Sequence, residues 1–215
     1  MSDFSISFQS RTDLDLEEMS FVHGVQGEIL CSPTDEDEDE VVVGKLSLSY
    51  INMADAIDNG YDPYLFLDVD GSLAELTPLY NSDGEFSKRV QRITKKEVFS
   101  LNTLVIDQLE ILPGYRKQKL GLQCIHRCIQ LFAHDQALVT LRCVPLQFRR
   151  SESARRDEWI TQLRLDKFDA QRDVCQAKLE KYFQQLGFKK VPKTNLMVLN
   201  PALRQPGPEE LGFNW

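Results

Sequence analysis

The chain has no apolar run that approaches the roughly 20 residues needed to cross a bilayer, so the sequence predicts no membrane-spanning helix. Its first residues, MSDFSISFQS, contain neither a basic stretch nor an apolar segment of the kind that opens a secretory signal. These absences favour a cytoplasmic protein without a membrane partner. With 42% hydrophobic and 27% charged residues, the 215-residue chain has the composition of an ordinary globular domain with a buried core.

Spacings typical of metal ligands are also missing. The cysteines number five, and the closest two, Cys124 and Cys128, have no second pair to complete a zinc site. His126 lies between them in sequence, but on a helix two steps of about 100° turn it to a different side. We therefore expect reduced thiols that pack mostly as small apolar side chains, and no bound metal.

Negative charge is concentrated in one place. The net charge is −8, from 25 basic and 33 acidic residues, and six of the acids are consecutive, at residues 35–40. Outside this run the two signs nearly balance. Adjacent like charges repel one another and cannot pack, so we interpret the run as a solvated loop, with a lure for a basic partner as the functional alternative. The basic residues are scattered among acids, which argues against a nucleic-acid partner.

Hydrophobic periodicity predicts an α/β domain with a mixed sheet. Helical spacing predicts helices at residues 120–132 and 169–186, the second ended by Gly187, and shorter helical pieces between residues 53 and 92. The order strand, helix, strand, helix, strand in the second half favours a partly parallel sheet. Residues 149–168 are polar and rich in arginine, as in an insertion. Alternation or apolar runs predict strands at residues 27–31, 41–50, 102–111, 138–144 and 188–199.

The stretch YLFLDVDGSL, residues 64–73, resembles the first motif of haloacid-dehalogenase-like phosphatases. In those enzymes the first aspartate is the nucleophile and the second a general acid/base, so the resemblance implies these roles for Asp68 and Asp70. A Mg²⁺ site would also need a later acidic pair near a strand end, and no adjacent aspartates follow the motif. We therefore favour a surface turn or helix start, capped by Asp70 or Ser72, over a phosphatase site.

The segment LEILPGYRKQKLGL, residues 109–122, is a better candidate for chemistry. Here a predicted strand ends, a turn follows and a helix begins. The first backbone N–H groups of a helix lack intrahelical partners and carry the positive end of its dipole. Arg116, Lys117 and Lys119 add three cationic side chains, so the segment predicts an anion site suited to a pyrophosphate.

This segment resembles the acetyl-CoA motif of the GNAT superfamily of N-acetyltransferases, in which a strand and Pro-x-Tyr-Arg precede a glycine-containing loop at a helix start. Pro113, Tyr115, Arg116 and the closing Gly121 match that pattern, whereas Lys119 stands where the family has its middle glycine. A second signature of the family, Tyr-x-x-Leu-Gly-Phe before the last strand, is similar to FQQLGF at residues 183–188. The two motifs follow in the family's order within residues 102–199.

The resemblance implies an α/β, GNAT-like fold with a mixed central sheet flanked by helices. Residues 93–200 would form the acyl-CoA-binding core, residues 1–92 the acceptor side with N-terminal strands, acidic loop and helices, and residues 201–215 a tail. It further implies acetyl-CoA as co-substrate and a small-molecule or protein amine as acceptor, and it leaves a homodimer open. The implied cofactor-binding residues are Leu109, Ile111, Arg116, Lys117, Gln118, Lys119, Leu120, Gly121 and Leu122.

The implied reaction is direct attack of an amine on the thioester. Backbone N–H groups around Ile111 would hold the acyl oxygen, and a carboxylate would take the amine proton. Asp107 and Glu110 are the acids on this strand; alternation predicts that they face opposite sides, and Glu110, nearer the motif, is the candidate base. The tyrosine that protonates the departing thiolate in many members aligns with Phe183. The neighbouring phenol, Tyr182, is the candidate acid, although one helical step turns it away from that position.

Three functions therefore stand as hypotheses: an acyl-CoA-dependent N-acyltransferase, a catalytically inactive GNAT-like interaction module and, with least support, a phosphatase. The inactive module is the alternative because Lys119 and Phe183 replace a glycine and a tyrosine on which the family's chemistry depends.

Overall fold

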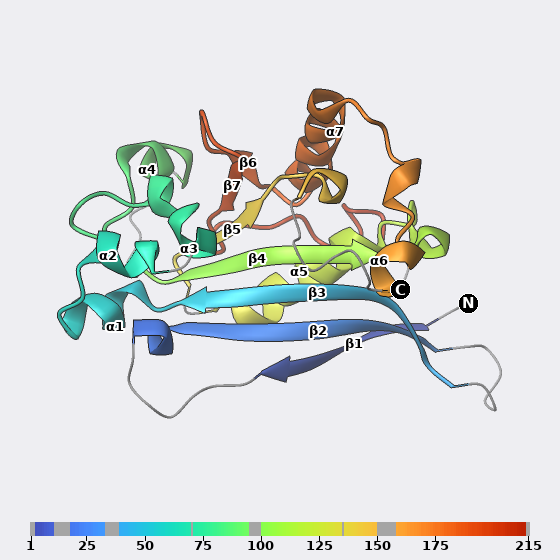
Figure 1. Cartoon of the computed structure of the whole chain (residues 1–215), viewed down its shortest axis with the longest axis horizontal. Coiled ribbons are helices and arrows are strands. Elements are labelled where there is room, and N and C mark those ends of the chain that lie inside the picture. Colours follow the sequence, from blue (N-terminus) through green and yellow to red (C-terminus); the bar gives the residue numbers. More distant parts are fainter. Residues whose placement is uncertain are drawn as a thin grey trace.

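The computed structural model describes residues 3–10, 18–32, 39–69, 71–94, 100–134, 136–149 and 158–213, without the side chains of residues 18 and 19. The described residues form an α/β protein with a seven-stranded mixed sheet (Figure 1). The strands are β1 (Asp3–Ser10), β2 (Val22–Ser32), β3 (Val41–Ile51), β4 (Thr103–Ile111), β5 (Leu138–Arg142), β6 (Lys189–Lys190) and β7 (Leu196–Leu199). The helices are α1 (Met53–Asp58), α2 (Pro63–Asp68), α3 (Gly71–Ala74), α4 (Lys88–Thr94), α5 (Leu120–Phe132), α6 (Glu158–Gln162) and α7 (Arg172–Gln184).

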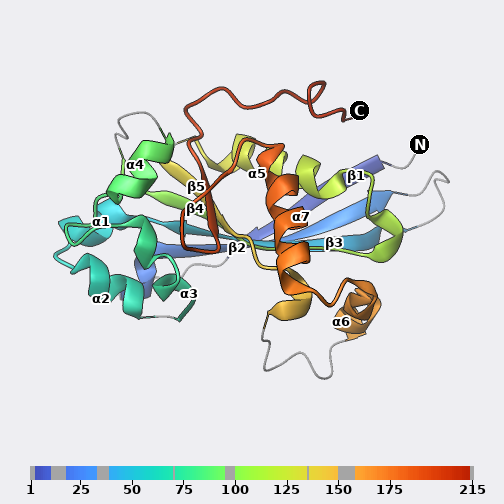
Figure 2. The same ribbon diagram turned by 90° about the horizontal axis from the view of Figure 1, so that it is seen from above.

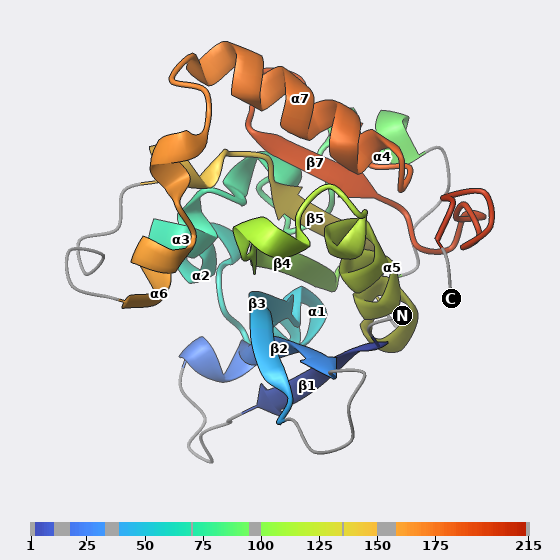
Figure 3. The same cartoon turned by 90° about the vertical axis from the view of Figure 1, so that its right-hand side faces the viewer.

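The strand order is β1-β2-β3-β4-β5-β7-β6, and β4 with β5 is the one parallel pair of this sheet. Helices α1 to α4 gather at one end of the sheet, and α6 and α7 lie toward the other (Figure 1). Seen from above, α7 crosses over the middle of the sheet (Figure 2). The view along the strands places α5 on one side of β4 and α6 on the other (Figure 3).

Most predicted elements are confirmed. The strands over residues 27–31, 41–50 and 102–111 are present as β2, β3 and β4, and the helix over residues 120–132 is α5. Gly187 ends the helical region after α7 with a φ of 93°, a left-handed conformation that glycine adopts without a side-chain clash. The region between residues 53 and 92 consists of short helices, as predicted.

One strand prediction is wrong, and one strand was missed. Residues 188–199 do not form one strand but a hairpin of β6 and β7, because a turn at Pro192–Asn195 reverses the chain. The strand β1 was not predicted at all. Its sequence DFSISFQS nevertheless alternates, and Phe4, Ile6 and Phe8 pack against the core while the residues between them are exposed.

The stretch that resembles a phosphatase motif is helical. Residues 64–67 belong to α2 rather than to a buried strand, and Asp62, whose carboxylate accepts from the N–H groups of Tyr64 and Leu65, caps the start of that helix. Asp68 is exposed at the end of α2, and Asp70 lies outside the described residues. The predicted cap by Asp70 therefore lies outside them as well.

The hydrophobic core occupies both faces of the sheet. On one face, Leu48 and Ile106 pack in the same cluster as Leu122 of α5. On the other, Val105 packs in the cluster that contains Phe66 of α2. Neighbouring residues of β4 thus point into different clusters, as alternation along a strand requires.

The segment beyond β7 is part of the core rather than a loose tail. Leu211 and Phe213 are buried in the cluster around α5, and the ring of Phe213 lies edge-on to His126 with 5.9 Å between centroids. Lys119 donates a hydrogen bond of 2.7 Å from Nζ to the carbonyl oxygen of Leu211. The tail therefore contacts the helix whose N-terminus carries the predicted anion site.

Close packing of β3 on β4 can be tested at a glycine. A Cβ on Gly44 would lie 2.6 Å from the backbone oxygen of Glu110 and 2.7 Å from Cδ1 of Ile29. The hydrogen bonds between β3 and β4 prevent the two strands from moving apart to make room for it. We predict that Gly44→Ala lowers the free energy of unfolding by about 1–3 kcal/mol in urea denaturation. Gly24 of β2, with no atom within 4 Å of its Cβ position, is the control, and Gly24→Ala should change it by less than about 0.5 kcal/mol. Equal effects would contradict the close contact.

Candidate functional site

Strands β4 and β5 diverge halfway along β4. Their parallel pairing runs from Thr103 opposite Leu138 to Ile106 opposite Leu141 and then stops, although β4 continues to Ile111. On the other side of β4, Ser47 and Leu48 of β3 lie opposite Gln108 and Ile106, so Asp107 is the additional residue of a β-bulge. The divergence begins at this bulge and leaves one edge of β4 without a strand partner.

The bulge also changes the direction of the side chains that follow it. Asp107 accepts a hydrogen bond of 2.5 Å from Ser49 Oγ, and Glu110 lies opposite Lys45. Ser49 and Lys45 alternate with leucines that pack toward α5, so both acids lie on the face away from α5. The prediction that Asp107 and Glu110 face opposite sides is therefore wrong, because the extra residue interrupts the alternation.

Two arginines mark the open edge of β4. Arg149 donates from Nη1 to the carbonyl oxygen of Asp107 at 2.8 Å, and Arg116 donates from Nε to that of Ile111 at 2.7 Å. Alternate residues of a strand direct their N–H and C=O groups to the same edge. Leu109, which lies between these two residues, therefore presents its backbone N–H and C=O groups to the open edge.

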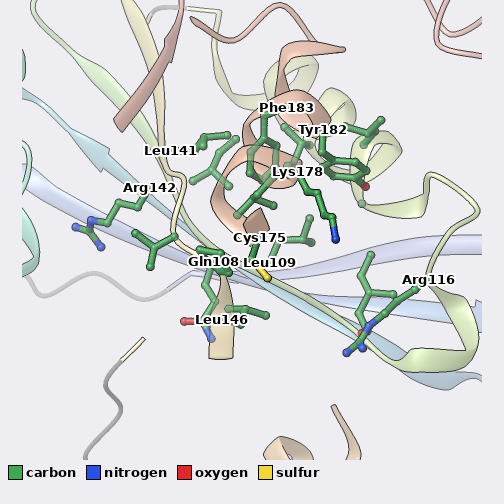
Figure 4. A pocket seen from close by; sticks show the side chains of 18 of the residues that line it. Gln108, Leu109, Arg116, Leu141, Arg142, Leu146, Cys175, Lys178, Tyr182 and Phe183 are labelled. Atoms are coloured by element: carbon green, nitrogen blue, oxygen red, sulfur yellow. The ribbon is translucent and has the colours of Figure 1, made fainter. Parts of the chain in front are cut away.

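A cavity of about 550 Å³ lies along this edge, between β4, the end of β5, the start of α5 and the side of α7 (Figure 4). Arg142 and Arg116 lie at opposite ends of it, and Lys178 extends into the space between them. Among the described residues, Asp107 is the one acidic residue in its lining. The cavity wall is therefore mostly apolar and carries an excess of positive charge.

The loop before α5 has an unusual backbone. Lys117 and Lys119 have φ angles of 66° and 61°, in the left-handed region that favours glycine. Lys119 is the N-cap residue of α5, and its side chain makes no capping hydrogen bond, so the N–H groups of Leu120 and Gly121 have no capping acceptor from it and can face a ligand. The position at which a lysine replaces the middle glycine thus has the conformation that a glycine would adopt most easily.

Gly121 allows three elements to meet at the start of α5. A Cβ on this residue would lie 2.6 Å from the hydroxyl of Tyr182, 3.1 Å from Cδ2 of Leu109 and 3.3 Å from Cδ1 of Ile111. Any larger side chain would push α7 or β4 away from the helix. The closing glycine of the motif therefore has a direct packing role.

Tyr182 and Phe183 of α7 both line the cavity (Figure 4). The prediction that one helical step turns Tyr182 away is wrong, because the α7 face that lines the cavity is wide enough to include both neighbouring rings, whose centroids are 5.5 Å apart. Burial raises the pKa of Tyr182 to about 12, against the opposing effect of a hydrogen bond with the backbone of Leu122. The phenol is therefore protonated at neutral pH and can donate a proton.

Glu110 has a different environment from the one predicted. Its side chain is 6% exposed and is absent from the cavity lining that the described residues form. The carboxylate accepts hydrogen bonds from Trp159 Nε1 at 2.6 Å and from Gln108 Nε2 at 2.5 Å. Lys45 Nζ lies 4.6 Å from the centroid of the Trp159 ring. Glu110 thus joins α6 to β4, and these contacts occupy both of its oxygens.

Arg116 is also held by the polar segment that follows β5. Its Nη2 donates to the carbonyl oxygen of Leu163 at 2.6 Å, and its guanidinium lies 4.7 Å from the centroid of the Phe168 ring. Burial lowers the pKa of Arg116, yet a guanidinium remains charged. The motif arginine therefore shapes the site through backbone carbonyls while its charge faces the cavity.

The N-terminal helices reach the site through Arg142. Its Nε lies 2.9 Å from Oε2 of Glu75, its Nη1 lies 3.8 Å from Oδ1 of Asp107, and its Nη2 donates to the carbonyl oxygen of Ser72. The segment after α2 thus contacts the bulge, but through Ser72 and Glu75. Asp68, the first aspartate of the phosphatase-like stretch, is not in the cavity lining that the described residues form.

Eight of the nine residues predicted to bind the cofactor line this one cavity, as does Tyr182, and Gln118 and Glu110 do not. Sequence analysis did not predict the roles of Gln108, Arg142, Arg149 or Lys178. Arg149 lies at the start of the segment interpreted as an insertion. Its place in the site follows from its hydrogen bond to Asp107, the residue of the bulge.

The sequence predicts neither a metal site nor a membrane-spanning helix. The described residues contain no group of three or more His, Cys, Asp or Glu side chains that could hold a metal ion. None of the helices in the described ranges has the length and apolar character needed to cross a membrane.

No family model, no curated protein and no solved structure matches this chain.

Proposed function

We propose that this protein is an acyl-CoA-dependent N-acyltransferase with a GNAT-like fold. The observation that carries the proposal is the cavity in which the unpaired edge of β4 meets the N-terminus of α5. A linear ligand with amide groups in the middle and a diphosphate at one end would complement such a cavity. Coenzyme A thioesters have this chemistry.

The strand arrangement supports the proposal. An N-acyltransferase of this type needs a splayed strand whose backbone faces the thioester, and β4 separates from its parallel partner at Asp107. The two sequence motifs also come together in space. Gly121, which closes the first, contacts Tyr182, which precedes the second by one residue.

The loop before α5 would hold the diphosphate. The first N–H groups of α5, which the side chain of Lys119 does not cap, would provide hydrogen-bond donors and the positive end of the helix dipole. Lys117, Lys119 and Arg116 add positive charge in the cavity lining. Further along, the backbone N–H and C=O groups of Leu109 would pair with an amide of the pantetheine arm, as a neighbouring strand would.

In the proposed reaction the amine nitrogen forms a bond to the thioester carbonyl carbon and the carbon–sulfur bond breaks, which yields an amide and a thiol. Asp107, the carboxylate in the described cavity lining, would accept the proton that the amine loses. Tyr182 would donate a proton to the departing thiolate, since its raised pKa keeps the phenol protonated. In this reaction Glu110 has a structural role and is not the base, because its two carboxylate oxygens accept hydrogen bonds from Trp159 and Gln108.

A catalytically inactive, GNAT-like interaction module is the second candidate, and one observation favours it. Lys119 donates to the carbonyl oxygen of Leu211, so in this conformation its ammonium group is bound to the tail. A loop lysine engaged in this way contributes less to a diphosphate site than a free one. Failure of acyl-CoA thioesters to bind at millimolar concentration would favour this candidate over the enzyme.

Binding of CoA should depend on the charge of the loop. We predict that Lys117→Gln and Lys119→Gln each weaken CoA several-fold in calorimetry, and that the loss is greater at low salt, because the lost interactions are between charges. Glutamine keeps most of the side-chain length at both positions. Lys189→Gln on the exposed strand β6 is the control and should leave CoA affinity unchanged. Equal affinities in all four proteins would remove the loop from the site.

Tyr182 can be tested separately from binding. If it protonates the leaving thiolate, Tyr182→Phe should lower kcat about a hundredfold or more with a panel of primary amines, and leave the Kd of acetyl-CoA within about twofold. Because its pKa is about 12, ionisation of Tyr182 should not lower the rate of the wild-type protein up to about pH 10. Release of free thiol measures the rate, and an unchanged kcat in the variant would exclude Tyr182 as the acid.

A further inference from the structure

The point at which β4 and β5 separate is occupied by a guanidinium. Arg149 donates from Nη1 to the carbonyl oxygen of Asp107 on β4 at 2.8 Å and from Nη2 to that of Arg142 on β5 at 3.2 Å. The last parallel pair, Ile106 opposite Leu141, immediately precedes these two residues. Arg149 therefore lies where the next hydrogen bonds between the two strands would form.

Only part of the hydrogen-bonding capacity of Arg149 is used. A guanidinium has five N–H donors, and two of those of Arg149 donate to carbonyl oxygens. The other three have no acceptor among the residues that the structure describes. Arg149 also lines the cavity, which would place these donors within reach of a ligand that extends along the open edge of β4.

The neighbouring charges are already paired with one another. Arg142 contacts the carboxylates of Glu75 and Asp107, and Asp107 also accepts from Ser49. Arg149 forms no ion pair within 4.0 Å in the described part of the chain, and burial is the main cause that lowers its pKa. Arg149 is partly buried, and the carboxylates of Asp107, Glu75 and Glu110 raise its pKa from beyond 4.0 Å, so the guanidinium would gain from an anionic partner in direct contact.

The position of Arg149 relative to the thioester points to the acyl group. In the proposed binding mode the diphosphate lies at the start of α5 and the pantetheine arm pairs at Leu109, so the acyl group would lie toward Asp107. An acetyl group would place a methyl group against a guanidinium and remove water from it without supplying an acceptor. A terminal carboxylate would supply two acceptors in the planar arrangement that arginine binds best.

We propose that the acyl donor is the CoA thioester of a short dicarboxylic acid, and that Arg149 binds the free carboxylate of its acyl group. The inference rests on the proposed function and specifies its donor. The carboxylate takes no part in the transfer: the bond to sulfur breaks and the bond to nitrogen forms at the other end of the acyl chain. Cationic groups at both ends of the cavity, with Arg116 at one and Arg142 and Arg149 at the other, fit a ligand that is anionic at both ends.

Two stable thioethers of CoA test this assignment without knowledge of the acceptor. S-(3-carboxypropyl)-CoA and S-butyl-CoA have the same four-carbon chain, with and without a terminal carboxylate. We expect the wild-type protein to bind the carboxylate form at least tenfold more tightly in calorimetry, because a site that hydrogen-bonds a polar group discriminates against an analogue that lacks it. Arg149→Gln should abolish this preference and leave the affinity for S-butyl-CoA within about threefold.

Arg149→Lys and Lys117→Gln are the matched controls. The lysine variant keeps the charge but not the planar donor set, so it should keep only part of the preference. Lys117→Gln, at the other end of the cavity, should weaken both thioethers by the same factor. Because the readout is a ratio, general damage to the fold by loss of the Arg149 bridge would lower both affinities and would not remove the preference selectively.

Equal binding of the two thioethers by the wild-type protein would overturn the assignment of the donor while leaving the acyltransferase proposal intact. A preference that persists in Arg149→Gln would assign the carboxylate to another residue and equally overturn the role of Arg149. Failure of both thioethers to bind would instead contradict the proposed function itself, and with it this inference.

Discussion

The β-bulge at Asp107 is the constraint on which the site depends. One additional residue in β4 ends its parallel pairing with β5, turns the side chains that follow to new faces and leaves a backbone edge open inside the protein. Unpaired backbone groups that are buried cost free energy, so this edge needs other partners. Arg149 and Arg116 supply them for the carbonyl oxygens of Asp107 and Ile111, and Leu109 between them faces the cavity.

Charged side chains at the site also join distant parts of the chain to it. Arg116 binds the carbonyl oxygen of Leu163, and Glu110 accepts from Trp159, so the segment with α6 packs against the end of β4. Arg142 links the bulge to Ser72 and Glu75 beside α3. The cavity is thus fixed by elements from both halves of the chain, although each contact is a local hydrogen bond or ion pair. Contacts of this kind would help to hold the proposed long, flexible ligand in one orientation.

Local patterns in the sequence predicted much of this arrangement. The periodicity of residues 120–132 predicted α5 with its observed bounds, and eight of the nine residues around the basic loop that were predicted to bind a cofactor line one cavity. The effects of the bulge could not be predicted, because a bulge depends on the register between two strands rather than on the composition of either. This is why Asp107 and Glu110 were placed on opposite faces and why Arg149 was taken for part of an insertion. The hairpin of β6 and β7 could have been predicted, since Pro192 and Asn195 are residues typical of a turn; the two-residue strand β6 is too short to show a pattern of its own.

Amide hydrogen exchange can test directly whether the open edge of β4 binds an acyl-CoA thioester, as we propose. The amide of Leu109 faces the cavity, whereas those of Gln108 and Glu110 face β3 by the same alternation and are already paired. With saturating ligand, we predict slower exchange at Leu109 and at the N–H groups of Lys119, Leu120 and Gly121, with no change at Gln108 and Glu110. Slower exchange confined to other elements, or unchanged exchange at Leu109 with ligand demonstrably bound, would contradict the claim.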